Sequence, residues 1–387
     1  MLRFLTAGES HGKCLMSILE GLPSGLGIKK EFINNELARR QRGYGRGGRM
    51  KIENDSVSIL SGVRWGKTTG SPMSLEIKNR DWINNHALMS IESADQNKSL
   101  YITKPRPGHA DLPGMLKYDM EDLRNIKERA SARETASRVA VGSVCKLFLM
   151  EFGIKIFSYV KEIGGIKASI TDSDLEKNYS KIENSPVRCL DQVAQKKMID
   201  EIDKAVKNGN TLGGTFKVIV KNVIPGLGSH IQWDKRLDSF LSAAVMSVPA
   251  IKGVEIGAGF ALSGMTGSKA QDEIFYNPKE QRFYRKTNFA GGLEGGITNG
   301  EDIVISAVMK PIPTLMNPLS SIDVKTKKTV KAEIIRSDAC AVPACSVVAE
   351  AMVAYVLANA IMEKFGGDSI REVTVNYKNY IKQTKNF

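Results

Sequence analysis

The chain has 387 residues, of which 42% are hydrophobic and 25% charged, a composition typical of a folded protein with a sizeable core. Its five cysteines are scattered without a C-x-x-C pair, which argues against a disulfide framework or a zinc site and favours reduced thiols and no metal. The net charge of +13 favours binding of nucleic acid, of an anionic membrane surface or of a polyanionic small substrate. No secretion signal precedes the first strand and no apolar run is long enough for a membrane span, so we expect a cytoplasmic protein.

Apolar runs and alternating patterns predict strands at residues 2–7, 71–81, 215–223 and 301–310. In the second segment, Met73, Leu75 and Ile77 fall on one face, which indicates a half-buried strand. The last segment predicts a more fully buried strand.

The apolar period of helices occurs in residues 131–153, 234–248 and 343–367. Asp234 is placed to cap the second helix, and Pro343 lies near the first position of the third. The wide apolar stripe of the third predicts a core helix.

These helices and strands are interleaved without the regular βαβ order of a doubly wound sheet. Nothing marks a linker, so we expect a single domain over residues 1–387. Residues 266–290 are polar and aromatic without periodicity, as in a mobile lid. The basic tail from about residue 376 to 387 is predicted to be frayed and flexible.

Residues 8–12 read Gly-Glu-Ser-His-Gly, and the glycines leave His11 exposed directly after the first strand. An imidazole titrates near neutral pH, which suits acid–base chemistry. The same residues match the nucleophile elbow of a serine hydrolase at Ser10, but an elbow needs a strand–turn–helix inside an α/β sheet. His11 as an acid–base group is the more economical interpretation.

His109 lies in the sequence Arg-Pro-Gly-His-Ala-Asp-Leu, where no helix or strand pattern surrounds it. Pro107 and Gly108 fix a turn locally. Such a histidine is either an ordinary surface residue or a proton donor held on a stiff loop.

Residues 39–51 concentrate cations among four glycines: Arg39, Arg40, Arg42, Arg46, Arg49 and Lys51. The segment can be a solvated basic loop, a nucleic-acid-binding segment of the Arg-Gly-Gly kind, or a clamp for a small anion. A single copy between a predicted helix and a predicted strand favours the clamp.

Ser131 followed by Glu134 predicts a capping box at the start of the first helix. A helix N-terminus favours anions, and Arg129 and Arg133 would reinforce such a site.

Two glycine pairs, 291–292 and 295–296, precede the last strand, and the stiff corner Lys310–Thr314 follows it. Paired glycines allow a flat ligand to lie against the backbone, but the spacing of a Rossmann fingerprint is absent. Asp338, two residues after Arg336, can cap the next helix or accept a proton.

Five motifs together resemble the chorismate synthase family of the shikimate pathway, in the same order from residue 8 to about 345. They are GESHG, RPGHAD, R-x-SARET, GG-x-x-GG leading to KPIPT, and RSD-x-C. One departure is Ala130, where many members of the family have a second serine.

The resemblance implies an α+β fold, a β-α-β sandwich with helices packed between sheets, assembled as a homotetramer. It implies that 5-enolpyruvylshikimate 3-phosphate loses phosphate and a ring hydrogen in an anti 1,4-elimination that gives chorismate. Reduced FMN is required, although there is no net redox change.

The resemblance also implies roles for individual residues. The catalytic set is His11, His109 and Asp338. The FMN-binding set is Arg129, Ala130, Ser131, Pro249, Ala250, Gly295, Lys310, Pro311, Ile312, Pro313, Thr314 and Arg336. The anion-binding set, for substrate or NADP, is Arg40, Arg46, Arg106 and Arg133.

Three points stay open at this level. The two histidines could share the jobs of protonating phosphate and flavin in either order. FMN could be reduced by NADPH on the protein or by an external flavin reductase, and we favour the latter. A nucleic-acid-binding protein and a serine hydrolase are the alternative functions.

Overall fold

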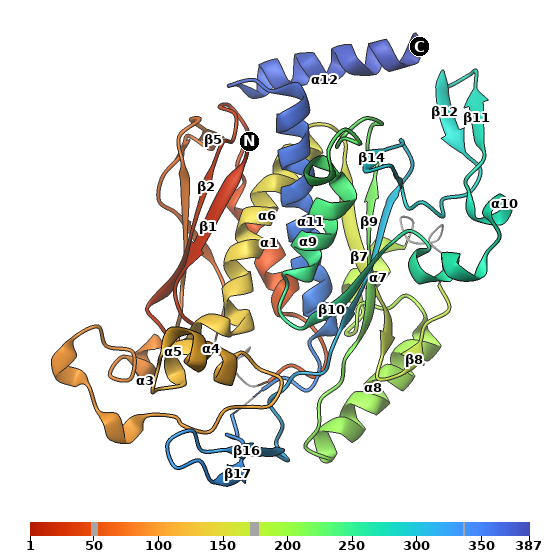
Figure 1. Ribbon diagram of the computed structural model, residues 1–387. Helices are drawn as coiled ribbons and strands as arrows, with labels where there is room; N and C mark the ends of the chain where they lie inside the picture. Colours follow the sequence, from red (N-terminus) through yellow and green to blue (C-terminus); the bar gives the residue numbers. More distant parts are fainter. Residues whose placement is uncertain (48–52, 171–177, 336) are drawn as a thin grey trace.

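The computed structural model describes residues 1–47, 53–170, 178–335 and 337–387, which form two β-sheets with a layer of helices between them (Figure 1). The first sheet has the order β1 (Arg3–Ala7), β2 (Cys14–Glu20), β6 (Met73–Lys78) and β3 (Val57–Ile59). The second has the order β10 (Ile251–Ile256), β15 (Ile303–Met309), β9 (Gly214–Lys221), β7 (Lys155–Ile163) and β8 (Ile166–Lys167). Neighbouring strands in both sheets are antiparallel. The β-α-β sandwich is confirmed.

The central layer consists of α1 (Lys30–Gln41), α6 (Thr135–Met150), α9 (Leu237–Met246) and α11 (Val342–Phe365). Helix α6 packs on β2 and β6 of the first sheet, and α11 packs on β7 and β9 of the second. Met73, Leu75 and Ile77 of β6 are all buried, as their alternation predicted. The core therefore lies between the helices and the inner face of each sheet.

Helices α6 and α11 lie against each other at Gly142. A Cβ atom at this position would lie 2.3 Å from the Cβ of Ala351, so only glycine fits this crossing without a shift of the helices. The two halves of the sandwich are joined through this close contact.

Helix α11 is long and apolar enough to cross a membrane, which the sequence pattern did not lead us to expect. However, 83% of its apolar window is buried inside the fold. A helix that is apolar on all sides suits a position between two sheets. The prediction of a core helix is confirmed, with Pro343 in its first turn.

Two predicted caps are wrong. Asp234 lies in the short turn Trp233–Lys235, and α9 begins only after Arg236, without a side-chain cap. The Ser131 hydroxyl accepts from the Arg133 amide at the 3-10 turn Ala132–Glu134, while the Glu134 carboxylate pairs with Arg138 at 2.8 Å. The capping box fails because Glu134 turns towards the next turn of helix instead of back.

The expected frayed tail is a helix. Helix α12 (Ile370–Lys385) begins at a capping box between Ser369 and Glu372. Its Val373 and Tyr377 are buried, and the Tyr377 ring packs on Phe152 and Phe365. These apolar contacts hold the segment against the end of the sandwich, where Figure 1 shows it crossing the other helices.

The segment predicted as a lid contains regular structure: α10 (Gly267–Ala270) and a hairpin of β11 (Ile274–Asn277) and β12 (Arg282–Arg285). The hairpin projects from the sandwich beside the C-terminus (Figure 1). The other helices are α3 (Trp82–Asn85), α4 (Asp111–Tyr118), α5 (Arg124–Ala130), α7 (Tyr179–Asn184) and α8 (Gln192–Lys207). The other hairpins pair β4 (Val63–Arg64) with β5 (Lys67–Thr68), β13 (Leu293–Glu294) with β14 (Ile297–Thr298), and β16 (Ser320–Ile322) with β17 (Thr329–Lys331).

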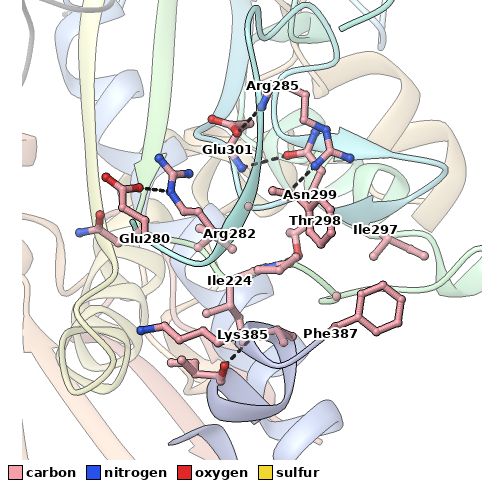
Figure 2. Close-up of a pocket in the computed structure, with 18 of the residues that line it drawn as sticks. Ile224, Glu280, Arg282, Arg285, Ile297, Thr298, Asn299, Glu301, Lys385 and Phe387 are labelled. Atoms are coloured by element: carbon pink, nitrogen blue, oxygen red, sulfur yellow. Dashed lines mark hydrogen bonds and ion pairs between the residues drawn. The ribbon is translucent and has the colours of Figure 1, made fainter. Parts of the chain in front are cut away.

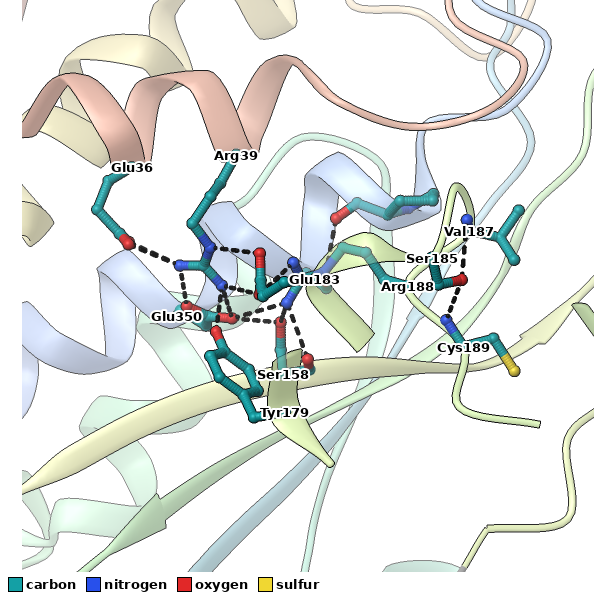
Figure 3. A network of polar contacts seen from close by, with 12 residues as sticks. Glu36, Arg39, Ser158, Tyr179, Glu183, Ser185, Val187, Arg188, Cys189 and Glu350 are labelled. Atoms are coloured by element: carbon teal, nitrogen blue, oxygen red, sulfur yellow. Dashed lines mark hydrogen bonds and ion pairs between the residues drawn. The ribbon is translucent and has the colours of Figure 1, made fainter. Parts of the chain in front are cut away.

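An ionic network inside the core surrounds Glu350 of α11 (Figure 3). This fully buried carboxylate lies 2.9 Å from Arg39, 2.5 Å from Lys146 and 3.2 Å from Arg188. Glu36 and Glu183 supply two more carboxylates, so three cations face three anions. Arg39 therefore serves the core and is not part of a basic surface loop.

Candidate active site

His11 lies in the loop between β1 and β2. Its ring Nδ1 is 2.8 Å from Glu128 Oε2, and its backbone amide donates to the same oxygen at 2.9 Å. On the other side, Nε2 lies 3.7 Å from the carboxylate of Asp81. The Asn79 side chain fixes the loop by donating to the carbonyls of Glu9 and Gly12 at 3.0 and 2.7 Å.

The carboxylate beside His11 is ionised. Burial acts to raise the pKa of Glu128, but the hydrogen bonds and charge of His11 and the ammonium of Lys127 outweigh burial and lower it. An ionised carboxylate only accepts hydrogen bonds, so Nδ1 of His11 carries the hydrogen and Nε2 is the nitrogen left for proton transfer.

His109, in a different loop, is also held at Nδ1 by a carboxylate. Its Nδ1 lies 2.5 Å from Asp111 Oδ1, and Asp111 is fully buried at the start of α4. Arg106 holds the same carboxylate with its backbone amide, Nε and Nη2, at 3.0, 2.8 and 3.0 Å. Burial acts to raise the pKa of Asp111, but hydrogen bonds from His109 and Arg106 lower it well below the ordinary value. This ionised acceptor leaves Nε2 of His109 for proton transfer.

The corner Lys310–Thr314 contacts the His109 loop. Arg106 Nη1 donates to the hydroxyl of Thr314 at 2.9 Å, and the Lys310 ammonium donates to the carbonyl of Gly108 at 2.5 Å. The Lys310 amide donates to the carbonyl of Ala250 at 2.9 Å, and Ala250 has a φ of +71°, which is unusual for a residue with a side chain. Segments around residues 109, 250 and 310 therefore meet at one place.

Arg40 and Arg133 form a buried pair around Asp55. Arg133 Nη1 lies 2.5 Å from Asp55 Oδ1, and Arg40 Nη1 lies 3.5 Å from Asp55 Oδ2. Arg40 also donates to Thr135 and to the carbonyl of Ala132, both at 2.9 Å. Burial lowers the pKa of Arg40 to about 10, although Asp55 opposes this shift. Arg40 Nη1 and Arg133 Nη2 make no hydrogen bond among the described residues, although each faces a carboxylate, Asp55 at 3.5 Å and Glu53 at 3.6 Å.

Asp338 faces the arginine segment. Its carboxylate lies 3.0 Å from Nε of Arg46 and accepts a hydrogen bond from the Gly47 amide at 2.6 Å. The arginines at positions 39, 40 and 46 thus all face carboxylates of this chain. That removes the main support for a solvated or nucleic-acid-binding segment in the described part of residues 39–51.

Arg129, Ala130 and Ser131 end helix α5, next to the His11 loop. The exposed Arg129 guanidinium donates to the carbonyls of Gly8 and Thr6 at 3.1 and 3.0 Å. Glu128 holds His11, and Arg129 follows Glu128 in the chain. The end of α5, where contacts with FMN are expected, therefore lies beside His11.

One expected cofactor residue, Gly295, is not brought into this group. Gly296 accepts a hydrogen bond from the Leu237 amide at the start of α9, whereas Pro249 and Ala250 follow the end of that helix. A helix of ten residues is about 15 Å long, so Gly295 lies at the far end of α9 from Ala250. Arg336 lies outside the described residues.

A cavity of about 1040 Å³ lies between the β11–β12 hairpin and the end of α12 (Figure 2). Arg285 crosses it to Glu294, at 2.8 Å, and Phe387 closes one side. None of the predicted site residues lines this cavity. We therefore place the candidate active site at the histidine loops, on chemistry and contacts.

Sequence patterns missed the residues that orient the histidines. Glu128 is 117 positions from His11, so no local pattern joins them. Asp111 stands two residues after His109, and this close spacing was the one signal available. Lys127 and Asp55 were missed as well, because each acts through a partner distant in the sequence.

The donors at the corner fit a flat, phosphorylated cofactor. The Lys310 ammonium uses one of its three N–H groups on Gly108, so two remain for an anionic ligand. The exposed guanidinium of Arg129 supplies a second cation. Pro311, Ile312 and Pro313 are exposed or half-buried beside them and offer apolar surface to a ring system. Among the described residues, no group of three or more His, Cys, Asp or Glu side chains could hold a metal ion.

Comparison with known proteins identifies the family of the chain. The family model described as chorismate synthase matches residues 2–362. The chorismate synthase of Geobacter sulfurreducens is 55% identical over 393 residues, covering 100% of both chains, and that of Geotalea daltonii is 53% identical over 396 residues at the same coverage. A crystal structure of a chorismate synthase superposes with a TM-score of 0.81 at 45% identity, over 100% of this chain and 99% of the other. The chain therefore belongs to the chorismate synthase family.

Proposed function

We propose that His11 and His109 are the acid–base groups with which this chain forms chorismate from 5-enolpyruvylshikimate 3-phosphate by anti 1,4-elimination of phosphate. The activity itself, that of a carbon–oxygen lyase of the shikimate pathway, follows from family membership. One observation supports the residue roles: each imidazole is held at Nδ1 by a buried carboxylate that is kept ionised. Each Nε2 is then free to carry a proton at a fixed position.

The substrate has a phosphate and two carboxylates, so its site must supply positive charge. We assign this role to Arg40, Arg46, Arg106 and Arg133. Arg40 Nη1 and Arg133 Nη2 have ion-pair partners at 3.5 and 3.6 Å but no hydrogen bond among the described residues, which supports donation from them to the substrate. We favour substrate over NADP for Arg40, since the fingerprint of a dinucleotide site is absent from the sequence.

The family requires a reduced flavin, and we propose that it is FMN. When bound, reduced FMN supplies transient electron density that helps the allylic phosphate to leave. Lys310 and Arg129 would hold its charged groups, and the backbone of Ser131, Pro249 and Ala250 would orient the ring. The protein positions the two molecules and excludes water from the site.

Three side chains donate, hold or accept the protons of the reaction. His11 and His109 donate or hold protons at Nε2. We assign the removal of the ring hydrogen to Asp338, which pairs with Arg46 at 3.0 Å. These groups lie on separate loops that the sandwich holds together, so their geometry depends on the whole fold.

The residue roles are tested by replacing each histidine separately. With the substrate and chemically reduced FMN under anaerobic conditions, His11→Gln and His109→Gln are expected to lower kcat about 100-fold or more, the size usual for a lost acid–base group. His86→Gln is the control, because His86 is exposed and lies outside the candidate site, with its ring Nδ1 2.9 Å from the carbonyl oxygen of Ile83. A His11 or His109 variant with full activity would remove that residue from the mechanism.

The source of reduced FMN and the assembly belong to the same proposal. We propose that an external flavin reductase supplies reduced FMN and that NADPH is not oxidised by the protein alone. NADPH consumption by the pure protein with FMN, in air-free buffer, would contradict this. We further propose a homotetramer, which light scattering during gel filtration would test.

A further inference from the structure

Lys127 stands next to Glu128, the carboxylate that holds His11, and is close enough to Arg106 of the His109 loop to feel its charge. Its side chain on α5 is only 13% exposed, and its ammonium is 3.6 Å from Glu128 Oε1. At this distance the contact is longer than an ordinary hydrogen bond, and Oε1 has no closer donor among the described residues. The ammonium therefore acts on Glu128 mainly through its charge.

We propose that Lys127 is a positioning residue for His11: its ammonium keeps Glu128 ionised, so that Glu128 holds the Nδ1 hydrogen and leaves Nε2 for proton transfer. The inference rests on the acid–base role of His11 given above. In this role Lys127 acts on His11 through Glu128.

A buried carboxylate prefers the neutral form unless cations or hydrogen bonds compensate. Glu128 is 1% exposed, and both hydrogen bonds from His11 go to Oε2. Among the described residues, the other oxygen, Oε1, is compensated only by the ammonium of Lys127. Without that charge, one half of the carboxylate would be buried with no compensation.

Other charged groups surround His11, Glu128 and Lys127. Asp81 faces Nε2 of His11 at 3.7 Å. Burial lowers the pKa of Lys127, Glu128 raises it, and Arg124 and Arg106 lower it further. Arg106 also holds Asp111 of the His109 loop, so Lys127 is the point at which the charges of both histidine loops meet.

The test uses ¹⁵N-histidine-labelled protein in NMR, since only four histidines give signals. His11 is assigned with His11→Gln. The measurement is the pH at which the Nδ1–H signal of His11 changes as Glu128 takes up a proton. In Lys127→Met this pH is expected to rise by about 1 unit or more, because a charge pair about 4 Å apart contributes about 1 kcal/mol even at the dielectric constant of water and more where it is buried. Lys127→Arg keeps the charge and should restore the wild-type value.

The control is Lys117→Met, which removes the same charge from an exposed position on α4. Its His11 signal should change at the wild-type pH. In Lys127→Met, the acidic side of the pH profile of kcat should shift to higher pH by the same amount as the NMR value. KM should stay unchanged within about twofold. Thermal unfolding of each variant checks that the fold is intact.

An unchanged NMR value in Lys127→Met would overturn the proposal. A raised KM with an unmoved pH profile would also overturn it, because Lys127 would then contact the substrate directly. Failure of the acid–base role of His11 can be told apart from failure of this proposal, because it would appear as full activity of His11→Gln. The NMR value would still report whether Lys127 acts through Glu128 on His11. If Lys127→Met does not fold, Lys127→Gln provides the same neutral side chain for the measurement.

Discussion

Glu128 Oε2 accepts hydrogen bonds from both the ring Nδ1 and the backbone amide of His11, at 2.8 and 2.9 Å. The ring and the loop that carries it are therefore fixed by one atom. This relationship sets both the tautomer of His11 and the direction of Nε2, which are the two properties that an acid–base group needs.

Replacing this carboxylate should impair catalysis more than stability. Glu128→Gln keeps the shape, but its amide does not enforce hydrogen on Nδ1. We expect kcat to fall about 10- to 100-fold, part of the 10²–10⁴ that a positioned acid–base group contributes. Anaerobic steady-state assays measure it. Glu121→Gln, at an exposed carboxylate just before α5, should keep full activity.

The partner of His109 should be sensitive in two ways. Asp111→Asn removes a buried charge that Arg106 contacts three times, so unfolding free energy should fall by about 3–5 kcal/mol. It also releases Nδ1 of His109, so kcat should fall as well. Urea unfolding and the anaerobic assay measure the two effects.

Asp119→Asn is the matched control on the same helix. Asp119 ends α4 with a φ of +53°, a conformation that asparagine tolerates well. Asp119→Asn should change neither the unfolding free energy nor kcat. A stable, fully active Asp111→Asn would contradict the role of this carboxylate.

The sequence predicted the elements whose pattern is local and missed those that depend on contacts between distant residues. The alternation of Met73, Leu75 and Ile77 is local and was sufficient for β6. The hairpin of β11 and β12 was missed, because Ile274 and Phe275 are both exposed and show no alternation. Tyr377 is buried only because α12 folds back on Phe365, which no pattern within the tail reveals.

The same limit applies to the candidate active site, where only residues marked by a local pattern could be predicted. His11 and His109 were found from glycine and proline turns around them. The cations at positions 39 and 40 look equivalent in the sequence, yet successive residues of a helix point about 100° apart. Arg39 enters the Glu350 network and Arg40 meets Asp55, so only the fold separates a core residue from a candidate binding residue.

The crossing of α6 and α11 gives a prediction about stability. Gly142→Ala places a Cβ 2.3 Å from that of Ala351, so the helices must separate. Overpacking should lower the unfolding free energy by about 1–3 kcal/mol, despite the better helix propensity of alanine. Gly264→Ala has no atom within 4 Å of the new Cβ and should lie within about 0.5 kcal/mol of wild type in urea.

The Glu350 network predicts how stability depends on acid. Burial acts to raise the pKa of Glu183, but Arg39 and Arg188 lower it from 4.5 to about 2. A folded-state pKa below the unfolded value adds stability that is present above about pH 4.5 and is lost as the pH falls to about 2.

Thermal unfolding between pH 7 and pH 2 measures this effect. Glu183→Gln should be less stable than wild type at pH 7 but should lose less stability between pH 4.5 and pH 2. Glu151→Gln, at an exposed position after α6, should follow the wild-type curve. Parallel curves for wild type and Glu183→Gln would show that Glu183 does not titrate in this range.

The most direct measurement is a single anaerobic reaction of the wild-type protein with 5-enolpyruvylshikimate 3-phosphate, once with reduced and once with oxidised FMN. Chorismate absorbance and released phosphate are followed together. The account predicts both products in equal amounts with reduced FMN and neither with oxidised FMN. Folded protein that yields no chorismate with reduced FMN, or that yields the same amount with oxidised FMN, would contradict it.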